Sequence, residues 1–325
     1  MPGAERRIAV VVGPGRSGTS TMAGALAQCG YHVPRAIEGD ATNPLGFFEP
    51  QWVVDLHTRL LRKAGVRTLD GDPAVLEAME RVTSADGVRT RLRTWLGRQL
   101  ARHERIVVKD PRLVWFTRLW REVAHDLGED PGFVVMLRHP SEVSSSRAEF
   151  YDSQQVSAVA GWINTALITE QLTQGSPRAF VRYPDLTAEW RPQIARVRDE
   201  LGLALDPEPT ADPHPIDDFI DPSLRRREAG WRDLPVPALL ADLGDRTYDA
   251  LGSLADGTAG PDLEELLTVI RSDYQRAHDD ALAIASAHIK RRVRDARRAG
   301  RTAAADLTTG TGTETATETA TGVIG

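Results

Sequence analysis

The segment Gly13–Ser20 brings together residue types that proteins use to hold an anion. Its order is Gly-Pro-Gly-Arg-Ser-Gly-Thr-Ser, between an apolar run and a stretch with helical spacing. Glycines allow a tight turn that directs backbone N–H groups at one point, and the helix start adds partial positive charge. Arg16 contributes a full charge, and Thr19 and Ser20 contribute hydroxyls. We therefore predict a phosphate-binding loop, with a plain strand-to-helix turn as the alternative.

Lys109 is a second candidate because lysine is rare in this chain. Of the 40 basic residues only Lys63, Lys109 and Lys290 are lysines, so arginine is the usual cation. Lys109 opens a Lys-Asp-Pro-Arg segment at the end of an apolar run. A compact, mobile ammonium suits a reaction centre whose charge shifts during group transfer. The pattern indicates a chemical role for Lys109, and a solvent-exposed lysine at a strand end is the alternative.

Arg138 and Ser146 form a second candidate anion site. Arg138 ends another apolar run, and Ser146 follows eight residues later in a predicted helix. A guanidinium forks onto phosphate oxygens, and a hydroxyl completes such a cradle. The alternative is that Arg138 pairs with an acidic side chain and that the serine has no role.

Glu49 is the candidate for accepting a proton. It ends a Gly-Phe-Phe-Glu segment just before a predicted helix at residues 50–64. A carboxylate enclosed between aromatic side chains suits a general base. The alternative is that Glu49 only favours the N-terminus of that helix. His57, two turns further along, is predicted to be a surface histidine.

Four apolar, β-branched runs predict buried strands of a parallel sheet, and the stretches between them have helical spacing. Strands are expected at residues 7–13, 105–109, 132–138 and 179–182, with a brief further strand at 30–33. Helices are expected at residues 17–29, 50–64, 113–127, 190–201 and 262–300. Two longer helical stretches are expected to be interrupted, residues 73–103 near Gly87 and residues 141–174 around Asp152. The predicted fold class is α/β, a P-loop-like three-layer fold with a central parallel sheet flanked by helices. Ligands of such sheets bind beyond the carboxyl ends of the strands, where each motif lies.

The domain organisation follows from composition. Residues 1–300 are predicted to form a single α/β domain, in which residues 206–222 with five prolines form an irregular excursion. Residues 301–325 are rich in Thr, Ala and Gly and have few apolar anchors. Such a segment cannot bury enough apolar surface to offset the cost of ordering, so a disordered tail is expected.

Two better-known motifs do not match Gly13–Ser20. A P-loop NTPase requires a lysine directly after the second glycine of its motif, and Thr19 occupies that position. A Gly-x-Ser-x-Gly nucleophile elbow also fails, because Gly18 comes directly after Ser17.

Together the motifs resemble those of sulfotransferases that use 3′-phosphoadenosine-5′-phosphosulfate (PAPS). Gly15–Ser20 resembles their 5′-phosphosulfate loop, and Lys-Asp-Pro at Lys109 resembles tyrosylprotein-type and some bacterial members. The resemblance implies that Arg138 and Ser146 bind the 3′-phosphate and that Arg16 and Lys109 contact the sulfuryl group and the bridging or leaving oxygen. The residues implied to hold the 5′-phosphosulfate are Gly15, Arg16, Ser17, Gly18, Thr19 and Ser20.

The resemblance implies further site residues. Glu49 lies in a Gly-aromatic-aromatic-Glu segment similar to that of bacterial members, where the glutamate is the general base. Glu38 is the runner-up, because the loop-to-glutamate spacing of some members matches it better. Tyr183, in Tyr-Pro-Asp-Leu, is implied to approach the adenine. Within the arginine run 225–227, Arg226 is the candidate for a second contact to the 3′-phosphate.

Composition limits the partners and the location. A net charge of −6 gives no reason to expect nucleic acid. Cys29 is the sole cysteine, so no internal disulfide is possible and the cytoplasm is the expected location. We expect neither a membrane span nor a signal peptide, since no apolar run is long enough. The eight histidines show no paired metal spacing, so no metal is expected. The arginine bias, with abundant Ala and Gly, is typical of a bacterium with a GC-rich genome.

The resulting prediction is an enzyme that transfers a sulfuryl group from PAPS to an acceptor hydroxyl or amine by in-line displacement. It would release 3′,5′-adenosine bisphosphate and need no metal. The acceptor is expected to be a small molecule or a carbohydrate; neither its identity nor the oligomeric state follows from the sequence. The rival hypotheses are a P-loop nucleotide kinase or NTPase and a nucleotide-binding module without catalysis.

Overall fold

Four parallel strands form the centre of the fold. The computed structural model describes residues 6–40, 43, 45–85, 87–150, 154–220 and 230–310. The strands are β1 (Ile8–Val12), β2 (Ile106–Lys109), β3 (Gly132–Leu137) and β4 (Arg178–Arg182), in the order β2-β1-β3-β4 with parallel pairing throughout. Every residue of β1, β2 and β3 is buried. This is why these runs are apolar on both faces, with Lys109 as the one charged exception.

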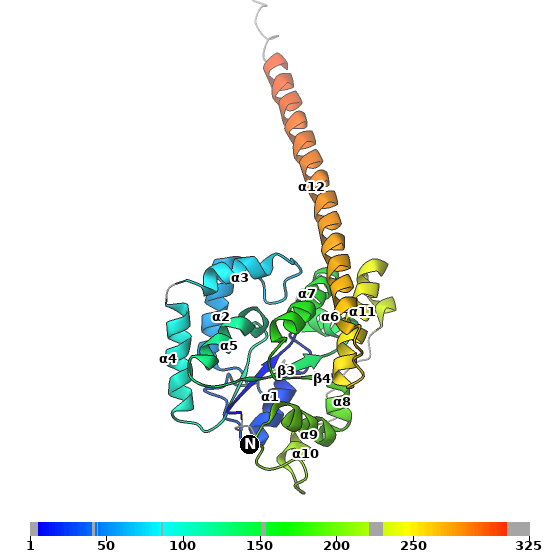
Figure 1. Cartoon of the computed structure of the whole chain (residues 1–325). Coiled ribbons are helices and arrows are strands. Elements are labelled where there is room, and N and C mark those ends of the chain that lie inside the picture. Colours follow the sequence, from blue (N-terminus) through cyan, green and yellow to red (C-terminus); the bar gives the residue numbers. More distant parts are fainter. Residues whose placement is uncertain are drawn as a thin grey trace, which may run out of the picture. The chain divides into compact units, whose positions relative to one another are not determined.

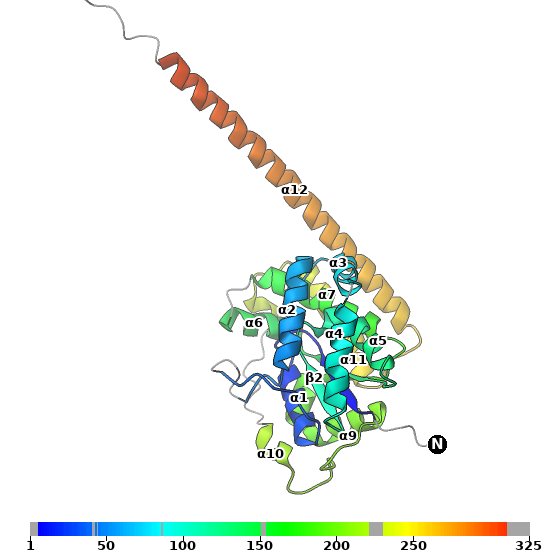
Figure 2. The ribbon, with the colours of Figure 1, turned by 90° about the vertical axis from the view of Figure 1, so that its left-hand side faces the viewer.

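Helices cover both faces of this sheet (Figures 1 and 2). On one face α1, α8, α9 and α10 enclose an apolar core with alternate strand residues such as Val11, Val134 and Val181. On the other face α11 packs on β3 and β4, and α7 packs against α5 and α11. The predicted three-layer α/β fold with a parallel sheet is confirmed.

The helices are α1 (Thr19–Gln28), α2 (Gln51–Ala64), α3 (Val75–Thr83), α4 (Val88–Leu100), α5 (Thr117–His125), α6 (Pro140–Phe150), α7 (Gln155–Thr173), α8 (Tyr183–Ala188), α9 (Trp190–Leu201), α10 (Pro215–Phe219), α11 (Ala238–Ala255) and α12 (Leu263–Gly310), with 3-10 turns η1 (Leu113–Phe116) and η3 (Trp231–Asp233).

Some predicted elements differ in detail. Residues 30–33 form no strand; His32 makes only an isolated bridge to Ile106. The predicted break near Gly87 is confirmed: residues 73–103 contain two helices, α3 and α4, and Gly87 with φ of 85° caps the start of the second. The proline-rich excursion contains the short helix α10, because His214 and Asp217 form a capping box at its start.

The chain divides into two compact units, Met1–Tyr274 and Gln275–Gly325. The division falls inside α12: Leu267, Ile270 and Tyr274 are buried in the first unit. The helix continues to Gly310, so residues 301–310 of the predicted disordered tail are helical. The alanines at 303–305 are strong helix formers, which is consistent with this continuation. Residues 311–325 lie outside the described residues, and the domain boundary at residue 300 stays a prediction.

Candidate functional site

The loop between β1 and α1 has a conformation that glycine makes possible. Gly13 has a φ of 144°, and a Cβ there would lie 2.7 Å from the carbonyl oxygen of Met136. Gly18 has a φ of 83°, and a Cβ there would lie 2.0 Å from the ring of Tyr183. Arg16 also has a positive φ, 76°. The loop therefore turns sharply at the carboxyl end of β1 and lies close to β3 and α8.

The N-terminus of α1 has the properties of an anion site. Gly18 is the N-cap, no side chain caps the helix, and its first turn contains no acidic residue. The first N–H groups of a helix have no partner within it, so they point into the loop. Ser17 is fully buried, and its hydroxyl has no hydrogen-bond partner among the residues that the structure describes. A buried, unpartnered hydroxyl is costly, and an anion bound here would accept its hydrogen bond.

The two predicted anion sites lie next to each other. Nε of Arg16 donates to Oγ of Ser146 at 3.0 Å. Nη1 of Arg138 donates to the carbonyl oxygen of Arg16 at 3.2 Å. The Arg138 guanidinium lies 5.1 Å from the ring centre of Tyr183. Since β1, β3 and β4 are successive neighbours in the sheet, their carboxyl ends bring Arg16, Arg138, Ser146 and Tyr183 to one edge of it.

Arg138 also pairs with an acid, as the alternative interpretation of the sequence proposed. Its Nε donates to Oε2 of Glu142 at 2.8 Å, one helical turn further along. Both side chains are about nine-tenths buried, with exposures of 10% and 9%. The carboxylate thus fixes the guanidinium at the start of α6. The ion pair and the contact with the phosphate loop exist together, so Glu142 orients Arg138 without drawing it away from the loop.

Lys109 and Glu49 meet beside the first turn of α1. Nζ of Lys109 donates to Oε1 of Glu49 at 2.6 Å, to Oγ of Ser20 at 3.0 Å and to the carbonyl oxygen of Phe47 at 3.2 Å. The side chains of Lys109 and Glu49 are only 3% and 9% exposed. The alternative interpretation, a solvent-exposed lysine at the strand end, is excluded. The structure thus places the Lys109 ammonium within hydrogen-bonding distance of both the Glu49 carboxylate and Ser20 of the loop between β1 and α1.

Burial changes the acid–base character of Lys109. Removal from water lowers the pKa of its ammonium, and the charge of Glu49 acts in the opposite direction. A cation in such a dry environment interacts more strongly with charge that develops nearby than one in water does. This is the environment that a charge-stabilising residue in a group transfer needs.

The remaining predicted residues have different outcomes. Glu38 is exposed and lies outside the contacts that Lys109 makes, whereas Glu49 is buried in them. Tyr183 is buried at the start of α8, with its ring against Gly18; its contact with an adenine stays a prediction. The arginine run 225–227, and with it Arg226, lies outside the described residues.

The sequence-based prediction gave no functional role to three residues around Lys109. His57 is fully buried, so its prediction as a surface histidine is wrong. Its helix, α2, turns this side chain inward against Phe116, with the two rings stacked at 4.0 Å. Asp110 and Arg112 belong to the same Lys-Asp-Pro-Arg segment as Lys109 and bond to each other at 2.7 Å. The sequence signal that could have revealed the burial of His57 is its position within the apolar stripe of α2.

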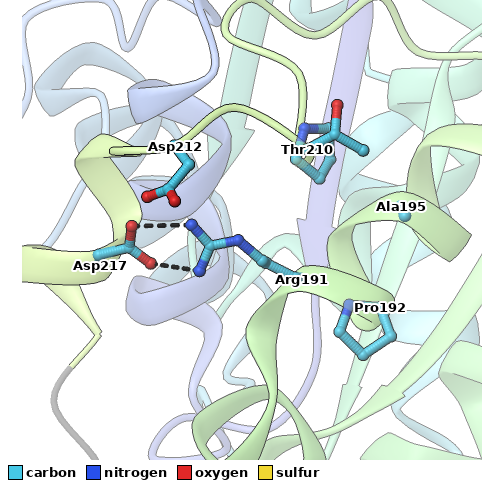
Figure 3. Close-up of a pocket in the computed structure, with 7 residues that line it drawn as sticks. Arg191, Pro192, Ala195, Thr210, Asp212 and Asp217 are labelled. Carbon is cyan, nitrogen blue, oxygen red and sulfur yellow. Dashed lines mark hydrogen bonds and ion pairs between the residues drawn. The ribbon is translucent and has the colours of Figure 1, made fainter.

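An open groove lies elsewhere, between α9 and the segment leading into α10 (Figure 3). Arg191 makes a bidentate pair with Asp217 there, at 2.6 and 2.8 Å. The hydrogen bond from Arg191 holds the pKa of Asp217 down at about 2. This pair neutralises both charged groups, and none of the predicted site residues lines the groove.

The described residues contain no group of three or more His, Cys, Asp or Glu side chains arranged to hold a metal ion. Among the same residues, no helix combines the length and apolarity needed to cross a membrane.

Comparison with known proteins gave structural neighbours only. No family model matches the chain, and no curated protein matches it. A sulfotransferase domain from the olefin synthase of Synechococcus PCC 7002 is 19% identical, with a TM-score of 0.44, over 76% of this chain and 97% of that one. A sulfotransferase domain from the curacin biosynthetic pathway is 13% identical, with a TM-score of 0.40, over 82% of this chain and 96% of that one.

Proposed function

We propose that this protein is a sulfotransferase that moves a sulfuryl group from PAPS to an acceptor hydroxyl or amine. One observation carries the proposal: Nζ of Lys109 lies 3.0 Å from Oγ of Ser20 and 2.6 Å from Oε1 of Glu49. A transferable group held at the N-terminus of α1 would therefore lie beside both a cation and a proton acceptor. These are the groups that an in-line transfer between oxygens requires.

The nucleotide would extend from the phosphate loop toward α6. Gly15–Ser20 would hold the 5′-phosphosulfate through backbone N–H groups and the unpartnered hydroxyl of Ser17. Arg138 and Ser146 would hold the 3′-phosphate, and both contact Arg16 of the loop. A donor with two separated anionic groups matches two adjoining anion sites better than a simple nucleoside triphosphate does.

The proposed chemical step uses three side chains. The acceptor oxygen or nitrogen forms a bond to sulfur while the bond from sulfur to the 5′-phosphate oxygen breaks. That oxygen leaves with the electron pair on 3′,5′-adenosine bisphosphate, and Glu49 takes the acceptor's proton. Arg16 and Lys109 stabilise the charge on the sulfuryl group and on the leaving oxygen. The step needs no metal, since these two cations supply the positive charge.

Two measurements test this function. Calorimetry should show that 3′,5′-adenosine bisphosphate binds more tightly than ATP with Mg²⁺. Incubation with sulfur-labelled PAPS and a cell extract, followed by mass analysis, should yield labelled products that are absent without the protein. Equal or tighter binding of ATP would instead support the kinase or NTPase hypothesis. Tight binding of the bisphosphate with no labelled product would support a nucleotide-binding module without catalysis.

A further inference from the structure

A chain of buried hydrogen bonds runs behind Lys109. Nδ1 of His57 lies 2.8 Å from Oδ2 of Asp110, and both side chains are completely buried. Nε1 of Trp120 lies 3.1 Å from Nε2 of His57. An indole N–H can only donate, so Nε2 of His57 must accept and its ring proton must be on Nδ1. His57 is therefore a donor to Asp110 in a defined tautomer.

Asp110 in turn fixes Arg112. Its Oδ1 accepts from the backbone N of Arg112 at 3.0 Å and from Nη1 of Arg112 at 2.7 Å. Burial opposes ionisation of Asp110, but the hydrogen bond from His57 and the charge of Arg112 outweigh it and lower its pKa to about 2. Both oxygens of the Asp110 carboxylate accept hydrogen bonds from His57 or Arg112. Asp110 is therefore not available to a ligand and holds the Arg112 guanidinium in place.

Arg112 is the end of this chain that reaches the proposed site. Its Nη1 lies 3.8 Å from Oε2 of Glu49, on the carboxylate oxygen that Lys109 does not occupy. The Arg112 side chain is 23% exposed, against 3% for Lys109. Glu49 thus has two cationic neighbours: a lysine on a flexible stem and an arginine whose position Asp110 fixes.

We infer that Arg112 is a further residue of the transfer site, positioned on Glu49 by the buried pair His57–Asp110. The inference rests on the proposed function. An incoming sulfuryl group is anionic and attracts Lys109. When Lys109 turns to that group, Glu49 loses its nearest cation. Arg112 stays in place and holds the carboxylate toward the acceptor. Arg112 contacts Glu49 directly, whereas His57 and Asp110 are positioning residues that act through Arg112.

The test is a double-mutant cycle read by the initial rate of product labelling. The assay uses sulfur-labelled PAPS and the extract fraction in which the wild type forms product. Arg112→Gln should lower the rate about tenfold, the size typical of coupling between contacting residues. His57→Leu should lower it similarly, and His57→Asn, whose amide N–H can still donate to Asp110, should recover most of the rate. The double variant His57→Leu/Arg112→Gln should be no slower than the slower single variant.

Controls separate positioning from folding. Binding of 3′,5′-adenosine bisphosphate should be unchanged in each variant, because none of these residues lies in the proposed nucleotide site. Arg118→Gln, at an arginine that is 60% exposed on α5, should keep the wild-type rate. An Arg112→Gln rate within twofold of the wild type, or rate losses that multiply in the double variant, would overturn the inference alone. A wild type that labels no product would overturn the proposed function and this inference together.

Discussion

At the scale of single residues, the site concentrates groups that are costly to bury. Ser17 has a buried hydroxyl without a partner, and Lys109 has a buried ammonium against Glu49. Each lies within one turn of the N-terminus of α1. Such groups lower stability unless a ligand uses them, so their clustering supports a binding site rather than a structural turn.

Ser17→Ala should affect stability and binding in opposite ways. Removing an unsatisfied hydroxyl leaves the free energy of unfolding unchanged or raises it by about 1 kcal/mol. Losing the same hydroxyl weakens binding of 3′,5′-adenosine bisphosphate about fivefold, which corresponds to about 1 kcal/mol. Urea unfolding and calorimetry measure the two effects.

The matched control for Ser17 is Thr165→Val on α7. Thr165 also has a buried hydroxyl without a hydrogen-bond partner, but it lies away from the loop. This variant should show the same direction of stability change and unaltered nucleotide binding. If Ser17→Ala binds the bisphosphate as the wild type does, Ser17 is not part of the nucleotide site.

Lys109→Met should slow sulfuryl transfer about 10²–10³-fold, the loss typical of removing one charged donor from a transition state. The labelled-product assay reports the rate, and binding of 3′,5′-adenosine bisphosphate should change little because that product lacks the sulfuryl group. Lys63→Met, at an exposed lysine near the end of α2, is the control. A Lys109→Met rate close to that of the wild type would exclude the proposed role.

At the scale of elements, a strand end followed by a helix start recurs around the site. β1 leads into α1 through the loop Gly13–Gly18, β3 leads into α6 through Arg138, and β4 leads into α8 at Tyr183. Because the strands are parallel neighbours, these connections converge without long loops. Close convergence leaves little room for side chains, which explains the glycine at position 18.

Gly18→Ala and Gly87→Ala form a matched pair that measures this convergence. Both glycines are N-caps with similar positive φ, 83° and 85°. An added Cβ meets nothing within 4 Å at Gly87 but collides with the Tyr183 ring at Gly18. Each variant should lose about 1–2 kcal/mol from the left-handed conformation, and Gly18→Ala should lose about 1–3 kcal/mol more from overpacking. If both variants lose the same free energy of unfolding in urea, the Tyr183 ring moves aside without an energetic cost.

At the scale of the whole molecule, the first unit contains every described residue of the proposed site. The start of α12 belongs to that unit, because Leu267, Ile270 and Tyr274 contribute to its core. The second unit contains a predominantly polar helical segment and adds none of the predicted site residues.

Two truncations test this division. A chain ending at residue 280 should unfold at nearly the wild-type temperature and bind 3′,5′-adenosine bisphosphate equally well. A chain ending at residue 262 loses the three buried side chains of α12 and should be less stable by several kcal/mol, since each large apolar side chain removed from a core costs about 2–5 kcal/mol. Thermal unfolding distinguishes the two. A large loss of stability on ending at residue 280 would contradict the division.

The sequence by itself determined the strands, their parallel pairing and the order of the motifs. Apolar β-branched runs and glycine-rich turns are local signals, so β1 to β4 and the loop at Gly13–Ser20 could be predicted. The choice of Glu49 over Glu38 as the glutamate beside Lys109 depended on the tertiary structure. So did the burial of His57 behind Asp110.

The physical reason is that packing between distant segments carries no local signature. Glu49 meets Lys109 because residues 45–50 fold back over the first turn of α1, and His57 turns inward because α2 lies against η1 and α5. A pattern of residue types reports how a segment folds, whereas the neighbours of a side chain depend on how separate segments pack together.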